Sequence, residues 1–167
     1  MNVSDTGTDS LFLALGSNLG DREHQIHTAL RKIEARIGRI ISLSALYHTR
    51  PEGFDSPNEF VNCVCEVDSR LDIYTIFAIT QNIEVDLGRV KKSVNGSYAD
   101  RLIDIDLIMA GDMILDTPLL TLPHPRFHRR DFVLTPLCEI APDLVHPVLG
   151  KTIRQLKDEL PLEETDQ

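Results

Sequence analysis

The distribution of apolar residues along the chain predicts four strands and two helices. Short or alternating apolar runs, which are typical of strands, occupy residues 11–16, 40–48, 60–68 and 102–110. Apolar positions at helical spacing run from Asp21 to Ile37, and a second such stretch follows Asp72, whose carboxylate can cap a helix N-terminus. Gly38 and Gly88 follow these stretches, where a helix often ends. The predicted order is therefore β-α-β-β-α-β.

This order is that of the ferredoxin-like α+β sandwich, an antiparallel sheet with both helices on one face and the other face open. Residues 111–160 add short C-terminal elements. A chain of 167 residues is long enough for one ordinary domain and too short for two. We expect a single domain over residues 11–160, with flexible tails at 1–10 and 161–167.

Composition narrows the cellular setting. Hydrophobic residues make up 42% of the chain and charged residues 26%, as in globular proteins. No apolar run reaches the roughly 18 residues that a membrane span needs, and the polar N-terminus does not resemble a secretory signal. The three cysteines, an odd number, favour a reducing compartment. We therefore expect a cytoplasmic protein with no membrane partner, and nothing in the sequence indicates more than a monomer.

The distribution of charge indicates a small anionic ligand. A net charge of −9 argues against a nucleic-acid backbone as partner. Yet seven of the 17 Lys and Arg residues fall within two short stretches, 89–101 and 126–130. Charge alone leaves open the alternative of two solvated charged loops.

Alternation along two strands brings polar side chains to the open face of the sheet. In the strand at 60–68, Val61, Cys63, Cys65 and Val67 would face the helices, so that Phe60 and Asn62 face the other way. In the strand at 102–110, Ile103, Ile105, Leu107 and Met109 would share the helix-facing side. Asp104 and Asp106 would then join Phe60 and Asn62 on the opposite face.

The pair Asp104 and Asp106 predicts a magnesium site. Carboxylates at i and i+2 on one strand face lie roughly 6 Å apart, and at an effective dielectric constant near 20 their repulsion is about 3 kcal/mol. Mg²⁺ relieves such repulsion and commonly uses one or two carboxylates plus phosphate oxygens. The alternative is a pair of exposed acids on an edge strand, each paired with Lys or Arg.

Two further motifs are better explained by structure than by a binding or metal site. The segment Gly16-Ser-Asn-Leu-Gly20 lacks the Lys-Ser/Thr of a phosphate-binding loop, so we interpret it as a tight turn with Asn18 facing the site. Cys63 and Cys65 have no second ligand pair at zinc spacing, which favours a place in the core.

Taken in order, the motifs resemble the hydroxymethyldihydropterin pyrophosphokinase family of folate biosynthesis. The resemblance covers residues 11 to about 158 and rests on these stretches: Leu15-Gly-Ser-Asn-Leu-Gly-Asp-Arg22; Tyr47-x-Thr-x-Pro-x-Gly53 with Phe60-Val-Asn62; Glu84-x-x-Leu-Gly-Arg89 with Arg101-Leu-Ile-Asp-Ile-Asp-Leu107; and Leu122-Pro-His-Pro-Arg126 with Arg130-Asp-Phe-Val-Leu-x-Pro-Leu137. Tyr98 stands where the family commonly has tryptophan, in a loop about two residues longer than usual.

The resemblance implies an enzyme that transfers the diphosphate of ATP to the hydroxymethyl group of 6-hydroxymethyl-7,8-dihydropterin and releases AMP. It implies two Mg²⁺ ions on Asp104 and Asp106, and Arg89 and Arg101 as catalytic arginines flanking a loop. The residues implied for the pterin are Thr49, Arg50, Glu52, Phe60, Asn62 and Phe132. Those implied for the nucleotide are Gln81, Glu84, Lys92, Thr121, His124 and Arg130.

Two other functions remain open at this point. A metal-dependent nucleotidyltransferase also combines a Gly-Ser turn with an Asp-x-Asp strand, although it places the two close together in sequence. A non-enzymatic ferredoxin-like module that binds a small ligand has the same fold but no need for a metal pair.

Overall fold

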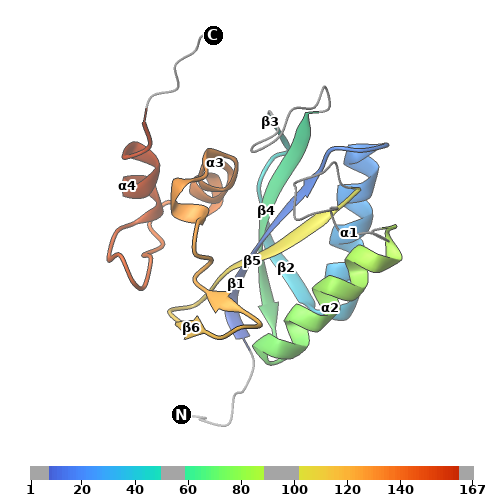
Figure 1. The fold of residues 1–167 in the computed structure, drawn as a ribbon, viewed down its shortest axis with the longest axis horizontal. Helices are drawn as coiled ribbons and strands as arrows, with labels where there is room; N and C mark the ends of the chain where they lie inside the picture. The colour runs from blue at the N-terminus through green and yellow to red at the C-terminus, as the bar shows by residue number, and fades with distance from the viewer. Residues whose placement is uncertain (1–7, 50–58, 89–101, 162–167) are drawn as a thin grey trace.

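The computed structural model describes residues 8–49, 59–88 and 102–161, and an antiparallel sheet forms its centre (Figure 1). The elements are, in chain order, β1 (Thr8–Ser17), α1 (Arg22–Arg36), β2 (Gly38–Leu43), β3 (Tyr47–Thr49), β4 (Phe60–Ser69), α2 (Ile73–Asp86), β5 (Asp104–Ala110), β6 (Leu115–Asp116), β7 (Thr121–Leu122), η2 (Phe127–Arg129), α3 (Asp131–Ile140) and α4 (Ile153–Asp158). The main sheet has the order β2-β4-β1-β5, with β3 also paired to β4, and β6 and β7 form a small second sheet. The predicted ferredoxin-like arrangement is confirmed.

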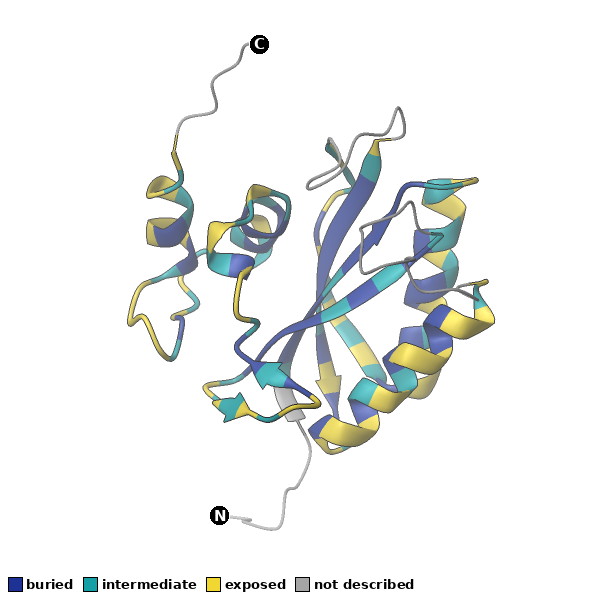
Figure 2. Cartoon of the chain, in the orientation of Figure 1, coloured by how far each residue is buried: buried dark blue, intermediate teal, exposed yellow. Residues whose placement is uncertain are grey.

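Helices α1 and α2 cover one face of this sheet because every second strand residue is apolar. Leu13 of β1 lies opposite Cys65 of β4 and Leu107 of β5, and all three side chains belong to the buried layer beneath the two helices. Figure 2 shows that burial concentrates along the central strands and on the inner sides of the helices. The predicted inward direction of both cysteines is confirmed.

The starts of both helices follow from their capping residues. The Asp21 carboxylate accepts the backbone N–H of His24 at 3.2 Å, and α1 begins at Arg22, the residue after Asp21. The Asp72 carboxylate accepts the N–H groups of Tyr74 and Thr75, each at 3.0 Å, at the start of α2. Each carboxylate satisfies N–H donors that have no partner within the helix, as predicted for Asp72.

The second face of the sheet is not open along its whole length, and here the sequence prediction was wrong. Residues of η2, α3 and α4 bury a second apolar layer against it, and Figure 1 shows these elements on the side opposite α1 and α2. Its buried members are Phe12, Val64, Ile108, Met109, Phe127, Val133, Leu134, Leu137, Ile153 and Leu156. The apolar stripe of α3 requires such a partner surface, which the sheet supplies.

A register shift between β1 and β5 explains one error of face assignment. Phe12 lies opposite Met109 but Leu13 lies opposite Leu107, so Ile108 is an extra residue in the ladder. The bulge reverses the alternation beyond Leu107, and Met109 therefore packs in the second layer with Phe12 rather than under the helices.

Two local expectations also need correction. The strand predicted over residues 40–48 is interrupted, with β2 ending at Leu43 and β3 beginning at Tyr47. Gly38 does not cap α1: it is the first residue of β2, where a Cβ atom would lie only 2.2 Å from the carbonyl oxygen of Asp68. Gly88 does adopt the positive φ, +106°, that favours glycine after a helix.

Within the described ranges, no helix has the length and apolar character needed to cross a bilayer.

Candidate functional site

Asp104 and Asp106, the predicted metal ligands, are the first and third residues of β5. Both are half-buried, whereas Ile105 between them is buried in the layer under α1 and α2. Because successive strand residues point to opposite faces, the two carboxylates lie on the face turned away from those helices.

The register of the sheet places Asp104 in one row with Gly16 and Asn62. Gly16 of β1 lies directly opposite Asp104 of β5 on one side and directly opposite Asn62 of β4 on the other. Directly opposed residues of antiparallel strands point to the same face, and two strand spacings separate the ends of the row by about 10 Å. The carboxylate of Asp104 and the amide of Asn62 therefore face the same side, with only a glycine between them.

Gly16 is required because of this row. A Cβ atom at position 16 would lie 2.8 Å from Oδ1 of Asn62 and 3.5 Å from Cδ1 of Phe60. Gly16 belongs to β1, so the tight turn predicted over residues 16–20 is shorter than expected, and Gly20 with φ +67° is its turn glycine. Sequence reasoning recognised the glycine but not its reason, which is space for two neighbouring side chains.

Three of the predicted pterin residues come together on β3 and β4. Phe60 lies opposite Thr49 in the ladder, and Nδ2 of Asn62 donates a hydrogen bond to Oγ1 of Thr49 at 2.6 Å. Asn62 is 6% exposed, so this bond fixes the direction of a buried amide. Arg22 of α1 donates to the carbonyl oxygen of Glu59 at 2.7 Å and anchors the chain just before Phe60.

Phe132, the fourth predicted pterin residue in the described chain, comes from the first turn of α3 and packs at the margin of the second apolar layer. The guanidinium carbon of Arg130, the residue that precedes α3, lies 5.4 Å from the centroid of its ring. This is the range of a cation–π contact, which orients the ring and the cation together.

His124 lies in a basic segment and is held as a neutral base. Its backbone N–H donates to the carbonyl oxygen of Ile108 on β5 at 2.9 Å, and its Nδ1 accepts the N–H of Arg126 at 3.1 Å. Burial, and then the positive charges of Arg130 and Arg126, lower the pKa of His124 to about 4. A neutral ring that accepts at Nδ1 carries its proton on Nε2, which makes that atom a hydrogen-bond donor.

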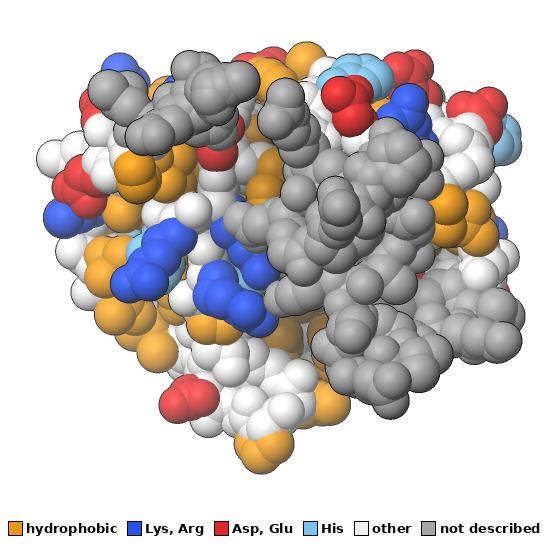
Figure 3. Space-filling model, turned by 45° about the horizontal axis from the view of Figure 1, so that its top comes forward, with side chains coloured by type: hydrophobic (Ala, Val, Ile, Leu, Met, Phe, Trp, Pro, Cys, Tyr) orange, Lys and Arg blue, Asp and Glu red, His pale blue; other side chains and the backbone are white. Residues whose placement is uncertain are grey.

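Positive charge also gathers at the surface of the molecule. Figure 3 shows Lys or Arg side chains gathered beside histidine on one face of the molecule. Such a group of donors and positive charge suits an anionic ligand.

Two predicted nucleotide residues lie on α2. Glu84 is buried, and its Oε2 accepts the backbone N–H of Ile105 at 2.7 Å, which ties α2 to the strand that carries the metal pair. Gln81 is exposed on the same helix. Thr121, a third member of the set, is half-buried in β7. A direct contact of each with the nucleotide stays a prediction.

The carboxylates present fit a magnesium ion that binds a phosphorylated ligand. Among the described residues, no group of three or more His, Cys, Asp and Glu is arranged to hold a metal. Two carboxylates on an otherwise apolar strand leave most of an octahedral shell for water and phosphate oxygens, as Mg²⁺ prefers. This pair of carboxylates therefore suits Mg²⁺ that is brought with a nucleotide.

Five predicted site residues lie outside the described ranges. They are Arg50, Glu52, Arg89, Lys92 and Arg101. Their assigned roles stay predictions, as does that of Tyr98.

Comparison with known proteins identifies a family over most of this chain. The family described as 7,8-dihydro-6-hydroxymethylpterin-pyrophosphokinase matches residues 12–142. A 2-amino-4-hydroxy-6-hydroxymethyldihydropteridine pyrophosphokinase of Porphyromonas gingivalis is 46% identical over 138 residues, which cover 82% of this chain and 93% of that protein. The enzyme of the same name from Aquifex aeolicus is 33% identical over 150 residues, covering 90% and 91%.

Similar sequences and folds also occur within longer proteins. The folic acid synthesis protein FOL1 of Dictyostelium discoideum is 38% identical over 160 residues, which cover 96% of this chain but only 24% of that protein. A crystal structure of Plasmodium falciparum HPPK-DHPS aligns with a TM-score of 0.73 and 19% identity, over 94% of this chain and 45% of that one. At that identity the similarity concerns the fold alone.

Proposed function

This chain belongs to the 7,8-dihydro-6-hydroxymethylpterin-pyrophosphokinase family, and we propose from that premise which of its residues perform the family's reaction. The enzyme transfers the diphosphate of ATP to the hydroxymethyl oxygen of 6-hydroxymethyl-7,8-dihydropterin, giving AMP and the pterin diphosphate, a step of folate biosynthesis. A nucleotidyltransferase activity is not favoured, because the relatives are named as pyrophosphokinases.

The row formed by Asp104, Gly16 and Asn62 is the main observation that supports these proposed roles. It supports a metal and phosphate subsite at the β5 end and a pterin subsite at the β4 end of one sheet face. A hydroxymethyl group attached to a pterin at the β4 end would then be directed along the row toward the phosphates. Phosphoryl transfer depends mainly on such positioning and on neutralised charge.

Asp104 and Asp106 hold Mg²⁺ in this proposal, and we expect two ions in the complex with ATP. Bound magnesium supplies charge neutralisation at the phosphate oxygens. The protein contributes two carboxylates on a strand fixed by Glu84, and it leaves the remaining ligand positions to ATP and water.

The pterin lies between Phe60 and Phe132, with its polar edge on Asn62. The bond from Asn62 to Thr49 supports this role because it fixes the amide before substrate arrives. Arg50 and Glu52, which follow Thr49 in the sequence, complete the proposed set.

The phosphates and base of ATP meet the basic segment after β7. Neutral His124 would donate from Nε2, and Arg130 would contribute charge from the start of α3. Gln81, Glu84, Lys92 and Thr121 complete the nucleotide set. ATP brings about four negative charges to carboxylates that are themselves anionic, so Arg89 and Arg101 are proposed to neutralise charge as the diphosphate moves.

The decisive experiment is incubation with ATP, Mg²⁺ and 6-hydroxymethyl-7,8-dihydropterin, followed by separation of the products. We expect AMP and a pterin diphosphate in equal amounts. Asp104→Asn and Asp106→Asn should each lower kcat by roughly two orders of magnitude or more, since each removes a metal ligand. Asp112→Asn, an equivalent change at an exposed residue just beyond β5, should leave kcat unchanged.

Two results would overturn the assignment. Free pyrophosphate with AMP attached to the acceptor would indicate nucleotidyl transfer instead. Full activity of both aspartate variants would show that the metal lies elsewhere. Calorimetric titration of Mg²⁺ in the presence of a non-hydrolysable ATP analogue tests the proposed number of two ions.

Two further properties belong to the proposal. We expect a monomer, to be checked by light scattering of the purified protein, and a cytoplasmic location, to be checked by cell fractionation.

A further inference from the structure

Glu139, in the last turn of α3, contacts the interruption between β2 and β3. Its carboxylate accepts a hydrogen bond from the Tyr47 hydroxyl at 2.5 Å. The same carboxylate accepts the backbone N–H of Ala45, at 3.1 Å to one oxygen and 3.3 Å to the other. Neither interaction was evident from the sequence, because 92 and 94 residues separate the partners.

The interruption itself is built by a serine. The Ser44 N–H donates to the carbonyl oxygen of Val64, and the Val64 N–H donates to Oγ of Ser44 rather than to a backbone carbonyl, both at 3.0 Å. The hydroxyl thus replaces one acceptor of the ladder, and the strand is displaced at this point. Ala45 then directs its N–H away from β4, to Glu139.

Beyond the interruption, β3 carries Thr49, which lies beside Phe60 and Asn62 of β4 in the proposed pterin site. Tyr47 lies directly opposite Asn62, and Thr49, two residues later, accepts the bond from the Asn62 amide. The position of this short strand relative to α3 therefore sets how far Thr49 and Asn62 lie from the residues at the other end of the helix.

Helix α3 carries Phe132, the proposed opposite wall of the pterin site. Phe132 is in its first turn and Arg130 precedes it, while Glu139 is in its last turn. The helix is also packed on the sheet through Val133, Leu134 and Leu137, so fixing its last turn to β3 limits the position of Phe132 as well.

The bond between Tyr47 and Glu139 keeps the same direction over the working pH range. The hydrogen bond to Glu139, followed by desolvation, raises the pKa of Tyr47 to about 12. The phenol therefore remains a donor at every pH at which the protein would be assayed.

We propose that Tyr47 and Glu139 are positioning residues, a clamp between β3 and α3 that holds the two walls of the pterin site at a fixed separation. The inference rests on the proposed pterin site, and neither residue needs to touch the substrate. Both partners are partly solvent-exposed, so we expect the clamp to affect geometry more than overall stability.

The test compares steady-state kinetics of Tyr47→Phe and Glu139→Gln with the wild-type enzyme. Each variant should raise KM for the pterin roughly fivefold and leave KM for ATP unchanged. This factor is on the order of the free energy of one charge-assisted hydrogen bond, reduced because both residues are partly exposed to solvent. Because the two residues share one hydrogen bond, the increase in KM for the pterin in the double variant should be clearly smaller than the product of the increases in the two single variants. Thermal unfolding of each variant shows whether it is folded.

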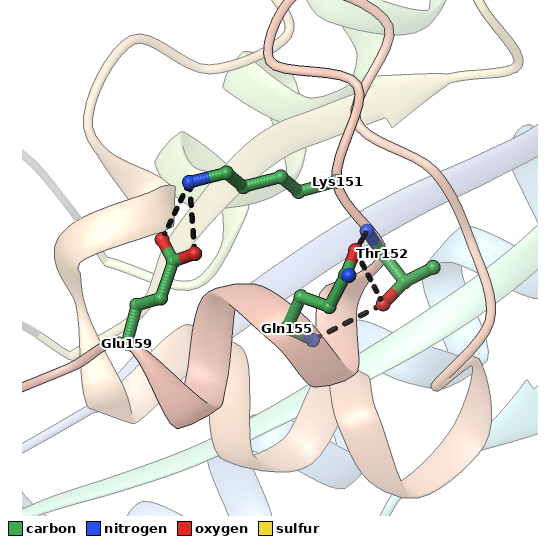
Figure 4. A network of polar contacts seen from close by, with 4 residues as sticks. All are labelled: Lys151, Thr152, Gln155 and Glu159. Atoms are coloured by element: carbon green, nitrogen blue, oxygen red, sulfur yellow. Dashed lines mark hydrogen bonds and ion pairs between the residues drawn. The ribbon is translucent and has the colours of Figure 1, made fainter.

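The chain offers matched controls for both substitutions. Tyr74→Phe removes a hydroxyl from a tyrosine on α2 that is 43% exposed. Glu159→Gln changes a carboxylate of the exposed pair with Lys151, at 2.8 Å, close to the capping interaction of Thr152 and Gln155 (Figure 4). Neither control should change KM for the pterin.

The possible results separate this inference from the proposed function. If the wild-type enzyme forms no pterin diphosphate, the proposed function fails and the clamp fails with it. If the wild type is active but Tyr47→Phe and Glu139→Gln behave as their controls, or change both KM values equally, only the clamp is overturned. Multiplicative effects in the double variant would likewise show that the two residues do not act as a pair.

Discussion

The Glu84 carboxylate on α2 accepts the backbone N–H of Ile105, the residue between Asp104 and Asp106, at 2.7 Å. Glu84 is only 7% exposed, so this bond satisfies a buried donor on the edge strand of the sheet. The helix-facing side of β5 thus fixes the backbone from which Asp104 and Asp106 project toward the other face.

Removing this carboxylate should therefore affect stability as well as catalysis. We expect Glu84→Ala to lower the free energy of unfolding by about 1–3 kcal/mol, because it leaves the Ile105 N–H without its acceptor. The KM for Mg-ATP should rise in the same variant, since the strand that carries the proposed metal ligands loses its anchor and the proposed contact of Glu84 with the nucleotide is lost. Urea denaturation and steady-state kinetics measure the two effects.

The control is Glu34→Ala, which removes an exposed carboxylate from α1 and should change the free energy of unfolding by less than about 0.5 kcal/mol. If the two variants unfolded at the same urea concentration, the anchoring role of Glu84 would be wrong.

Strand periodicity predicted one half of the site well. The direction of Cys63 into the core and of Asn62 away from it follows from alternation alone, and both are confirmed. Alternation failed where the ladder is irregular: the bulge at Ile108 turned Met109 to the other face, and Ser44 interrupted the edge strand. Both irregularities depend on the partner strand, which local sequence does not specify.

The second half of the site could not be derived from local patterns. Helix α3 is an apolar stretch whose partner, the second sheet face, was expected to be open. Its carboxylate Glu139 binds residues more than 90 positions away. Phe132 was predicted only through family resemblance and Arg130 also through its place in the basic stretch 126–130, because their positions depend on where this helix docks.

Gly16→Ala should impair pterin binding more than folding. The added methyl group would lie 2.8 Å from Oδ1 of Asn62, so the amide must rotate away and lose its bond to Thr49. We expect KM for the pterin to rise by about tenfold, on the order of one lost hydrogen bond, with KM for ATP nearly unchanged. Steady-state kinetics with each substrate varied in turn would show this.

Gly150→Ala is the matched control for that substitution. Gly150 has φ +70° and open space around its Cβ position, so alanine should cost about 1 kcal/mol of stability through backbone strain alone. Its KM values should equal those of the wild type. An equal rise in KM for the pterin in both variants would contradict the steric role of Gly16.

Phe60→Ala should weaken binding of the pterin much more than binding of the nucleotide. The ring borders the space above Gly16, and its proposed role is to stack on the pterin, which is worth about 0.5–1.5 kcal/mol beyond the area buried. We expect the Kd of the pterin to rise at least about tenfold once the lost contact area is included, while the Kd of an ATP analogue changes little. Phe77→Ala, a change on α2 where the ring packs against the core between helices and sheet, should lower stability without this selectivity. Equal weakening of both ligands by Phe60→Ala would contradict the stacking role.

The lowered pKa of His124 predicts a pH dependence of stability with a defined sign. Its pKa is about 4 in the folded protein, owing first to burial and then to Arg130 and Arg126, against 6.5 as the ordinary value. Below pH 6.5 the unfolded chain binds a proton at this histidine that the folded chain does not bind, and proton binding favours the unfolded state. The contribution of His124 to the free energy of unfolding is therefore fully present above pH 6.5 and is lost progressively as the pH falls to 4. The pKa values of His128 and His146 are also lowered and change stability in the same direction. The contribution of His124 is therefore isolated by comparing the wild type with His124→Asn. Urea unfolding at pH 7 and pH 4.5 should show the wild type losing about 1–2 kcal/mol more than His124→Asn, after discounting for partial exposure. An identical loss in both proteins would mean that folding does not lower the pKa of His124, and that burial and the two arginines do not keep its ring neutral below pH 6.5.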